Sequence, residues 1–559
     1  MFGKPKQEYK YELNDGGASL LRYQGKEENV VLPDSFEGKP LTALADNAFY
    51  DCKKLVSVTI PESVASVGNG CFKNCVSLKS VRLPEKLASL GDYAFALCKE
   101  LEDVSLPETL TNVPQGCFLK CKSLTRVNVG GSVTSLGEEA FSGCTQLKYL
   151  SLGENVREIG ENALKGLSDK LCLVLPEGLK NFDKKLAEGC DRLYRRRKEG
   201  LELMLYAGHE TDLILDDEVN GEPVTAVGDR VFAMFAYLEK LKLPKNLISI
   251  GDGAFAGCSS LTELLLPPTL RHIGRGAFAG CGQAEGVPGY VRMRGGDLAS
   301  YSGLTSLTLP EGLEDVGEKA FAGCAALKNV EIKGKDTYLG AGCFSLTAIE
   351  EFTFPAHAAE IQSELLRGCV NLKKVNIPSG VESVWDRAFE GCAALESVEL
   401  PESLEVIGEG AFSSMEKLKR IDLPAKVRQI GDEAFSFDPA LETVGISPEN
   451  EYFRLEDGCL IDRNENALIW VPAGKTGEFT VPDDVEAVRA CAFSLSAFTK
   501  VSLGQNVKKI GPWAFRGSEI KELKIQNPDA VIENGILLDT EDVEIDAPEA
   551  VLKRIGEEA

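Results

Sequence analysis

Residues 78–101 read LKSVRLPEKLASLGDYAFALCKEL, and this stretch decides the fold because it contains one complete copy of a unit that recurs along the chain. Val81 and Leu83 alternate with polar residues, which predicts a short strand with one buried face. Pro84 has no N–H to donate, so it is expected to end the hydrogen-bonded ladder. Each unit therefore begins with a strand of about four residues.

The second half of the unit predicts a turn followed by a short helical turn. Gly91 marks the turn. Apolar residues then follow at i, i+4 and i+7, the spacing of one helix face, at Ala94, Cys98 and Leu101. The cysteine returns every 23 residues, at Cys52, Cys75, Cys98, Cys121 and Cys144. Such a period indicates a stacked solenoid, because one unit cannot bury its apolar side alone.

The complete pattern, L-x-x-V-x-L-P-x-x-L-x-x-I-G-x-x-A-F-x-x-C, resembles the BspA-like leucine-rich repeats, a cysteine-bearing class also seen in treponemal surface proteins. The resemblance covers most of the chain, from about Val30 to Ile525. It implies a repeat solenoid, a right-handed superhelix of short parallel strands and short helical turns, with inserted β-hairpins. Counting strand cores along the sequence gives about 20 coils.

The chain also repeats on a larger scale, which predicts three segments. A shift of 183 residues lays Gly25, Gly38 and Pro40 onto Gly208, Gly221 and Pro223. We therefore expect a first array with an opening strand pair over 1–194, and a second array over 195–447. The remaining segment, 448–559, is expected to hold a β-hairpin, the last coils and a C-terminal cap over Pro548 to Glu558, with Leu552 and Ile555 on its buried side. The strands of that hairpin are expected at 459–461 and 467–471.

Charge and composition restrict the partners. The net charge of −25 argues against nucleic acid or an anionic membrane, because binding to those surfaces depends on clustered Lys and Arg. The one basic run, Arg195-Arg196-Arg197-Lys198, is interpreted as a solvated linker, with a phosphate or acidic-segment site as the alternative. There is no apolar run of 18 residues, so no membrane insertion is expected.

The amino terminus as given lacks the apolar segment of a signal peptide, which favours a cytoplasmic protein. A chain from which a signal peptide had been trimmed would look the same, and it would then belong on the cell surface.

The 17 cysteines are explained mainly by the repeat, so we expect buried, reduced thiols that can donate to backbone carbonyls. Bridges between neighbouring coils remain the alternative.

Cofactor and metal sites find little support in the sequence. No C-x-x-C pair, P-loop or G-x-S-x-G turn occurs, and the three histidines, His209, His272 and His357, form no metal-binding pattern. His272 is interpreted as a surface histidine. Two acidic columns follow the strand-ending proline and the turn glycine, for example Glu85 and Asp92. Calcium is a less favoured ligand for them, since one carboxylate per coil does not supply six to eight oxygens.

The remaining candidate is a protein-binding surface. The outward residues of the strands are small and polar in the first array and more charged in the second, as at Lys240, Lys242, Glu263 and Leu265. An irregular coil over 282–303 lacks the repeat markers and carries the candidate partner-binding residues Tyr290, Arg292, Arg294 and Tyr301, although drift of an unselected repeat explains it equally. We therefore expect a protein-binding scaffold without catalytic activity. The alternatives are an exported adhesin that binds host or neighbouring-cell proteins, which the resemblance implies, and a carboxylate enzyme on a solenoid.

Overall fold

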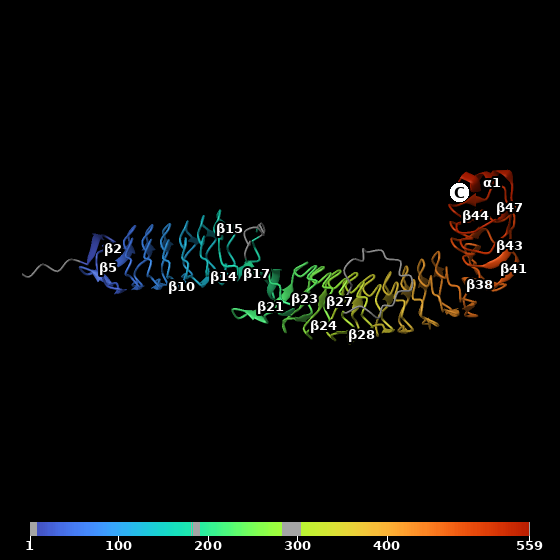
Figure 1. Cartoon of the computed structure of the whole chain (residues 1–559), viewed down its shortest axis with the longest axis horizontal. Coiled ribbons are helices and arrows are strands. Elements are labelled where there is room, and N and C mark those ends of the chain that lie inside the picture. Colours follow the sequence, from blue (N-terminus) through green and yellow to red (C-terminus); the bar gives the residue numbers. More distant parts are fainter. Residues whose placement is uncertain (1–7, 180–181, 183–189, 282–302, 558–559) are drawn as a thin grey trace, which may run out of the picture. The chain divides into compact units, whose positions relative to one another are not determined.

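The structure, a computed structural model, describes residues 8–179, 182, 190–281 and 303–557. Within these residues the chain winds into successive coils, each with a short strand followed by a second strand of about two residues (Figure 1). Strands of neighbouring coils pair in parallel, for example Val104 with Val127 and Val113 with Leu136. The solenoid of short parallel strands that the sequence predicts is thus confirmed. We call the first row of strands the strand ladder and the second row the turn-side ladder.

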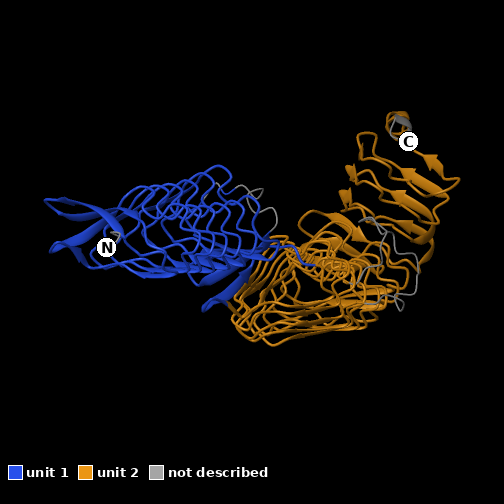
Figure 2. Cartoon of the chain, turned by 60° about the vertical axis from the view of Figure 1, so that its left-hand side comes forward, with its two compact units in different colours: residues 1–208, 219–228 blue, residues 209–218, 229–559 orange. Residues whose placement is uncertain are grey.

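The coils belong to two compact units, which Figure 2 shows in different colours. Unit 1 comprises residues 1–208 and 219–228, and unit 2 comprises residues 209–218 and 229–559. The expected segment boundaries at 194 and 447 stay a prediction.

The strand ladder of unit 1 contains β3 (Asn29–Val31), β6 (Ser57–Thr59), β8 (Ser80–Arg82), β10 (Asp103–Ser105), β12 (Arg126–Asn128), β14 (Tyr149–Ser151), β16 (Leu171–Leu175) and β17 (Cys190–Arg197). The turn-side ladder contains β7 (Ser66–Val67), β9 (Ser89–Leu90), β11 (Asn112–Val113), β13 (Ser135–Leu136) and β15 (Glu158–Ile159). The opening strands are β1 (Tyr9–Asn14), β2 (Gly17–Tyr23), β4 (Ser35–Phe36) and β5 (Lys39–Leu44). Their counterparts farther along the chain are β17, which also belongs to the strand ladder, β18 (Gly200–Tyr206), β20 (Glu218–Val219) and β21 (Glu222–Val227).

The strand ladder of unit 2 contains β19 (Asp212–Ile214), β22 (Lys240–Lys242), β24 (Glu263–Leu265), β26 (Ser306–Leu309), β28 (Asn329–Ile332), β30 (Glu351–Thr353), β32 (Lys374–Asn376), β35 (Arg420–Leu423) and β37 (Thr443–Ile446). Its turn-side ladder contains β23 (Ser249–Ile250), β25 (His272–Ile273), β27 (Asp315–Val316), β29 (Tyr338–Leu339), β31 (Glu360–Ile361), β33 (Ser383–Val384), β34 (Val406–Ile407) and β36 (Gln429–Ile430).

The predicted hairpin is confirmed near the end of unit 2. Antiparallel strands β38 (Phe453–Glu456), β39 (Cys459–Asp462) and β40 (Ala467–Trp470) precede the last coils. Those coils contain β41 (Thr476–Thr480), β42 (Ala487–Val488), β43 (Ala497–Leu503), β44 (Lys509–Ile510), β45 (Glu522–Ile525), β46 (Val531–Ile532) and β47 (Glu544–Asp546).

The predicted C-terminal cap is the helix α1 (Glu549–Glu557), although its buried side differs from the expected one. Val551 is fully buried in the core of the last coils, and Ile555 packs against that core. Leu552, which was expected on the buried side, is exposed instead. The Arg554 guanidinium donates to the backbone oxygen of Ala530 at 2.6 Å, which ties the helix to the coil beneath it.

The short helical turn predicted for each coil is wrong for the part of the chain that the structure describes, where α1 is the one α-helix. The A-F-x-x-C segment forms turns because its backbone bonds alternate between its own coil and the next. Phe72 N donates to Ala94 O of the next coil at 2.8 Å, whereas Cys75 N donates to Phe72 O at 3.1 Å. The i, i+4, i+7 spacing therefore reflects inward-facing turn residues and not a helix face.

The turn glycine serves close packing between coils more than it serves the turn itself. Gly91 does not have a positive φ. A Cβ atom there would lie 2.4 Å from Asn69 N and 2.4 Å from the carbonyl carbon of Gly68, both in the preceding coil. A Cβ atom added to Gly137 or Gly160 would likewise lie 2.4 or 2.5 Å from a backbone nitrogen of the preceding coil. The glycine column thus lets successive coils stack at backbone contact.

A column of phenylalanine rings runs through the core of unit 1, with one ring from each of five successive coils between Phe49 and Phe141. Phe72, Phe95 and Phe118 are fully buried, and neighbouring ring centroids are 5.2 and 5.6 Å apart. The rings are nearly parallel, with interplanar angles of 2° and 3°. The same column recurs in unit 2, where Phe232, Phe255 and Phe278 stack at 5.0 and 5.1 Å.

The basic run is not a solvated linker, since Arg195, Arg196 and Arg197 lie in β17. Arg196 Nε lies 2.7 Å from Glu222 Oε2, and the same guanidinium donates to Ser151 Oγ at 2.7 Å and to Leu152 O at 2.5 Å. Hydrogen bonding to the Glu222 carboxylate raises the pKa of Arg196. This arginine therefore joins the last coils of unit 1 to its second set of opening strands.

Candidate functional site

The outward residues of the strand ladder are exposed, as the alternation in the sequence predicts. In β10, Asp103 and Ser105 are exposed while Val104 between them is buried. In β22, Lys240 and Lys242 are exposed on either side of buried Leu241. Because the strands pair in register, each outward position forms a row along the unit. The ladder therefore presents side chains at fixed spacing from one coil to the next.

One stretch of this surface in unit 2 carries large apolar side chains. Ile214 is 65% exposed and Leu265 is 84% exposed. Strand pairing aligns Ile214 with Lys242 and Lys242 with Leu265, so the three form one row, and Lys240 lies two residues along the middle strand. We call Ile214, Lys240, Lys242 and Leu265 the ladder patch.

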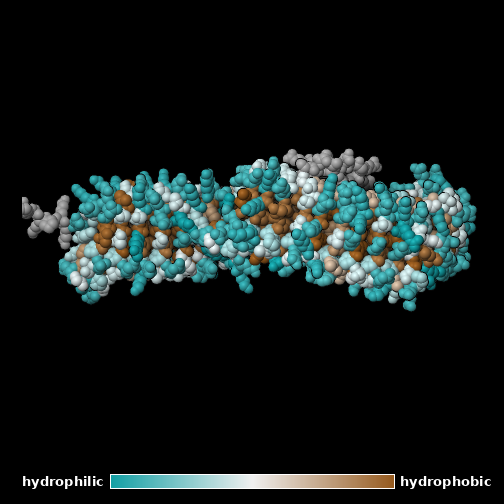
Figure 3. Space-filling view, turned by 90° about the horizontal axis from the view of Figure 1, so that it is seen from below, coloured by the Kyte–Doolittle hydropathy of each residue, from teal (hydrophilic) through white to brown (hydrophobic). Residues whose placement is uncertain are grey.

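Figure 3 views the chain from the side on which β10, β24 and β28 are labelled in Figure 1. Hydrophobic residues interrupt the hydrophilic surface along this side. The sequence indicated Leu265 and the two lysines but not Ile214. The 183-residue repeat was the indication that could have identified Ile214, because it aligns Ile214 with Val31 of the first array.

The four partner-binding residues expected from the sequence, Tyr290, Arg292, Arg294 and Tyr301, lie outside the described residues. Their role stays a prediction. The surface-histidine interpretation is confirmed for His272, whose side chain is 48% exposed and whose Nδ1 contacts Asp315 Oδ2.

Some residues of each acidic column bind the backbone of the next coil, a role that the sequence analysis missed. Their carboxylate oxygens accept hydrogen bonds from backbone N–H groups one coil onward. Glu62 accepts from Glu85 N (3.0 Å), Glu108 from Gly131 N (2.9 Å), Asp92 from Gln115 N (3.1 Å) and Asp252 from Arg275 N (2.8 Å). These bonds satisfy donors that the two ladders leave unpaired. The sequence indication was the period itself, because backbone groups of the next coil recur at the same interval as the carboxylates.

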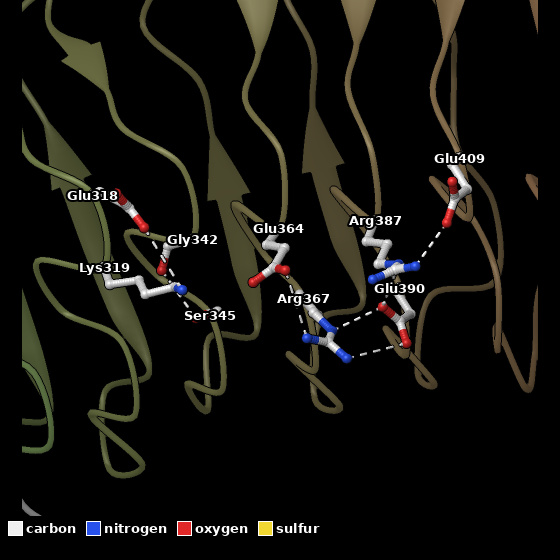
Figure 4. A network of polar contacts seen from close by, with 9 residues as sticks. All are labelled: Glu318, Lys319, Gly342, Ser345, Glu364, Arg367, Arg387, Glu390 and Glu409. Atoms are coloured by element: carbon white, nitrogen blue, oxygen red, sulfur yellow. Dashed lines mark hydrogen bonds and ion pairs between the residues drawn. The ribbon is translucent and has the colours of Figure 1, made fainter. Parts of the chain in front are cut away.

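Ion pairs also cross successive coils on the turn side of unit 2 (Figure 4). Arg367 Nε lies 2.8 Å from Glu390 Oε2, and Arg387 Nη2 lies 2.7 Å from Glu409 Oε1. Arg387 also approaches Glu390 at 4.0 Å, so the two pairs form one network. The side chains are about one quarter to one half exposed, and isolated pairs of this kind contribute at most about 1 kcal/mol each. The network therefore aligns coils, and its carboxylates already have cationic partners.

The repeat cysteines form a buried column beside the phenylalanine rings. Cys75 Sγ donates to Phe49 O at 3.1 Å, and Cys98 Sγ donates to Phe72 O at 3.1 Å, as the sequence analysis expects. Burial raises the pKa of the Cys98 thiol to about 12. Cys52, at the start of the column, is only partly buried, and hydrogen bonding from Cys75 lowers the pKa of its thiol.

This difference predicts which thiol reacts first. We expect native protein at pH 8 to be alkylated faster at Cys52 than at the fully buried cysteines of the column, because a thiolate is the reactive form and the thiols deeper in the column stay protonated and buried. Denatured protein should react at close to 17 cysteines. Mass spectrometry of peptides after a short pulse of iodoacetamide measures both values. Equal labelling of Cys52 and Cys98 in the native protein would contradict the burial described above.

Among the residues that the structure describes, no group of three or more His, Cys, Asp or Glu side chains is placed to hold a metal ion. In that part of the chain no helix is long and apolar enough to cross a membrane.

Comparison with solved structures returns bacterial leucine-rich-repeat proteins. A leucine-rich repeat protein from Bacteroides ovatus is 20% identical, with 79% of this chain and 94% of that chain covered and a TM-score of 0.29. The Leucine Rich Repeat protein of T. pallidum is 26% identical over 46% of this chain and 91% of its own, with a TM-score of 0.24. A leucine rich cell surface protein from Faecalibacterium prausnitzii is 24% identical over 71% and 94%, with a TM-score of 0.28. No curated protein matches this chain.

The sequence family described as the BspA type leucine rich repeat region matches this chain in six copies. The matched residues are 42–172, 116–195, 225–288, 292–379, 337–457 and 473–559, which together span most of the chain. The repeat unit, the paired ladders and this match agree, and the chain belongs to the BspA-type leucine-rich-repeat family.

Proposed function

We propose that this chain is a protein-binding scaffold and that the ladder patch of unit 2 is a contact region for its partner. Leucine-rich-repeat proteins are commonly interaction scaffolds and are generally non-catalytic. The repeat holds outward side chains on a rigid, regularly spaced backbone. Such a surface suits recognition of another protein more than it suits chemistry.

The exposure of Ile214 and Leu265 carries this proposal. At the same strand position, unit 1 has one exposed apolar residue, Val31, and then polar residues in four successive coils, Thr59, Arg82, Ser105 and Asn128. Unit 2 instead exposes two large apolar side chains on either side of Lys242. Burying such side chains against a partner would remove apolar surface from water, which is favourable by roughly 25 cal/mol per Å².

The lysines restrict the chemistry of the partner. The chain as a whole carries a net charge of −25, whereas the ladder patch presents Lys240 and Lys242. Complementary charge favours the correct partner and speeds its association. We therefore expect a partner with apolar side chains flanked by acidic groups.

Replacing the two apolar residues should weaken binding without unfolding the chain. The intact chain serves as bait, captured proteins are identified by mass spectrometry, and the affinity of the captured partner is then measured. For the double variant Ile214→Thr/Leu265→Asn we expect the dissociation constant to rise at least about tenfold, a loss of about 1.4 kcal/mol. Exposed positions seldom change stability by more than about 0.5 kcal/mol, so the thermal midpoint should stay nearly constant.

Val31 provides the matched control, because it is 74% exposed at the same strand position in unit 1. Val31→Thr should leave binding unchanged. A partner that binds the double variant and the wild type equally well would exclude the ladder patch.

The cellular location is a separate proposal. We propose that the scaffold is either a cytoplasmic protein or a surface adhesin. Protease treatment of intact native cells distinguishes them, since an adhesin would be cleaved and a cytoplasmic scaffold would survive.

A further inference from the structure

The turn-side ladder of unit 2 is interrupted between two neighbouring coils. Strands β27 and β29 pair in register, and so do β31 and β33. Strands β29 and β31, however, belong to separate sheets. The turn-side ladder therefore does not join the coil of Tyr338 to the coil of Glu360, although it joins each of them to its other neighbouring coil.

Small side chains open a space at this interruption. The third residue after the strand-ending proline is normally a buried leucine or valine, as at Leu313, Val381 and Leu404. After Pro355 it is Ala358, which is only half-buried, and the preceding coil buries Thr337 in this region. The missing side-chain volume contributes to a cavity of about 250 Å³ that is open to solvent.

The cavity has an apolar floor and a polar mouth. Apolar lining comes from Leu339, Phe354, Pro355 and Leu365. Charged and aromatic lining comes from Asp336, Tyr338, His357 and Glu360. The side chain of Tyr338 is accessible, with 54% of the residue exposed.

Neighbouring groups hold the two carboxylates in place through one oxygen each. Asp336 Oδ1 lies 2.8 Å from His357 Nδ1. Glu360 Oε2 accepts from Trp385 Nε1 at 3.1 Å and from Gln362 Nε2 at 3.1 Å. We assign the second oxygen of each carboxylate as the hydrogen-bond acceptor for a ligand.

We infer that this cavity binds a basic side chain, arginine or lysine, presented by a protein partner. The aliphatic stem of such a side chain suits the apolar floor, and its cationic group suits the carboxylates of Asp336 and Glu360. The exposed ring of Tyr338 adds an aromatic face for the cation. The inference rests on the proposed scaffold function, and it concerns a site separate from the ladder patch.

A small-molecule probe tests the cavity without a known partner. N-acetylarginine amide is titrated into the intact chain and followed by saturation-transfer NMR, with uncharged N-acetylnorleucine amide as the control ligand. We expect the arginine probe to bind with a dissociation constant on the order of 1 mM, as its small size allows. Binding should weaken at least tenfold in the double variant Asp336→Asn/Glu360→Gln. Glu396→Gln, which removes an exposed carboxylate from another coil, should change nothing.

Ala358→Leu is the sharper variant, because it restores the side chain that neighbouring coils carry. It should abolish probe binding while the thermal midpoint stays the same or rises, a combination that partial unfolding cannot produce.

Unchanged binding by Ala358→Leu, or equal binding of the norleucine control, would overturn the inference. Failure of the probe to bind would also overturn it, yet would leave the ladder patch untouched. Conversely, a chain that captures no protein but binds the arginine probe would count against the scaffold proposal alone.

Discussion

Replacing Phe95 by alanine should lower the free energy of unfolding by about 3 to 5 kcal/mol. The Phe95 ring is fully buried and stacks between Phe72 and Phe118 at centroid distances of 5.2 and 5.6 Å. Alanine would leave a cavity in the middle of the ring column. The coils cannot close it, because their backbones are already joined, for example by Phe95 N donating to Cys117 O at 2.9 Å.

Tyr50 is the matched control within the same array. Its side chain is exposed, with 40% of the residue accessible, so Tyr50→Ala should change stability by less than about 0.5 kcal/mol. Chemical denaturation of both variants measures the difference. Similar losses for Phe95→Ala and Tyr50→Ala would mean that the inward positions of the repeat are wrongly assigned.

The inward positions could be predicted because they recur at a fixed period. Val81, Phe95 and Cys98 are all buried, as the pattern of the unit indicates. A residue that returns every 23 positions, with variable residues around it, must meet the same environment in each coil. The period therefore predicts burial even where single propensities are weak.

The same period did not predict which backbone groups form hydrogen bonds with each other. The spacing of Ala94, Cys98 and Leu101 fits a helix face, but a turn that faces inward gives the same spacing. The deciding factor is hydrogen bonding between coils, as between Phe72 N and Ala94 O. Such bonds join residues about one coil apart, and a local pattern contains no information about them.

The interpretation of the basic run failed for a related reason. Four consecutive charged residues suggest a solvent-exposed linker. The 183-residue shift, however, lays β1 (Tyr9–Asn14) onto residues 192–197 of β17. That alignment was the available indication that Arg196 lies in an opening strand. Its partner Glu222 could not be predicted, since the ion pair depends on how β17, β18 and β21 lie side by side.

The candidate sites could be predicted only in part. Leu265 follows from the alternation of strand residues, whereas its row with Ile214 requires the register of β19, β22 and β24. The cavity near Ala358 depends on a missing side chain at a position that other coils fill. A small residue in one repeat is easily read as ordinary variation, and only the packing shows the space that it leaves.

Gly91→Ala should cost about 3 kcal/mol, at the upper end of the range for an overpacked core. The new Cβ atom would lie 2.4 Å from backbone atoms of both Asn69 and Gly68. A flexible side chain could move away from such a contact, but these backbone atoms are fixed by the stacking of the coils. Gly68 N itself donates to Leu44 O of the preceding coil at 2.8 Å. The clash must therefore separate neighbouring coils or distort the ladder between them.

Gly131→Ala is the matched control, because Gly131 occupies the position that Glu85 and Glu108 hold in other coils. A Cβ atom there meets only Glu108 Oε2 at 3.6 Å, an ordinary contact, and the φ of Gly131 is not positive. The substitution should be neutral or should stabilise by about 0.4 to 1 kcal/mol, because it restricts the unfolded chain. Urea denaturation of the two variants compares them directly. If both glycines tolerated alanine equally, the coils could not be stacked at backbone contact, and the glycine column would serve only the turn.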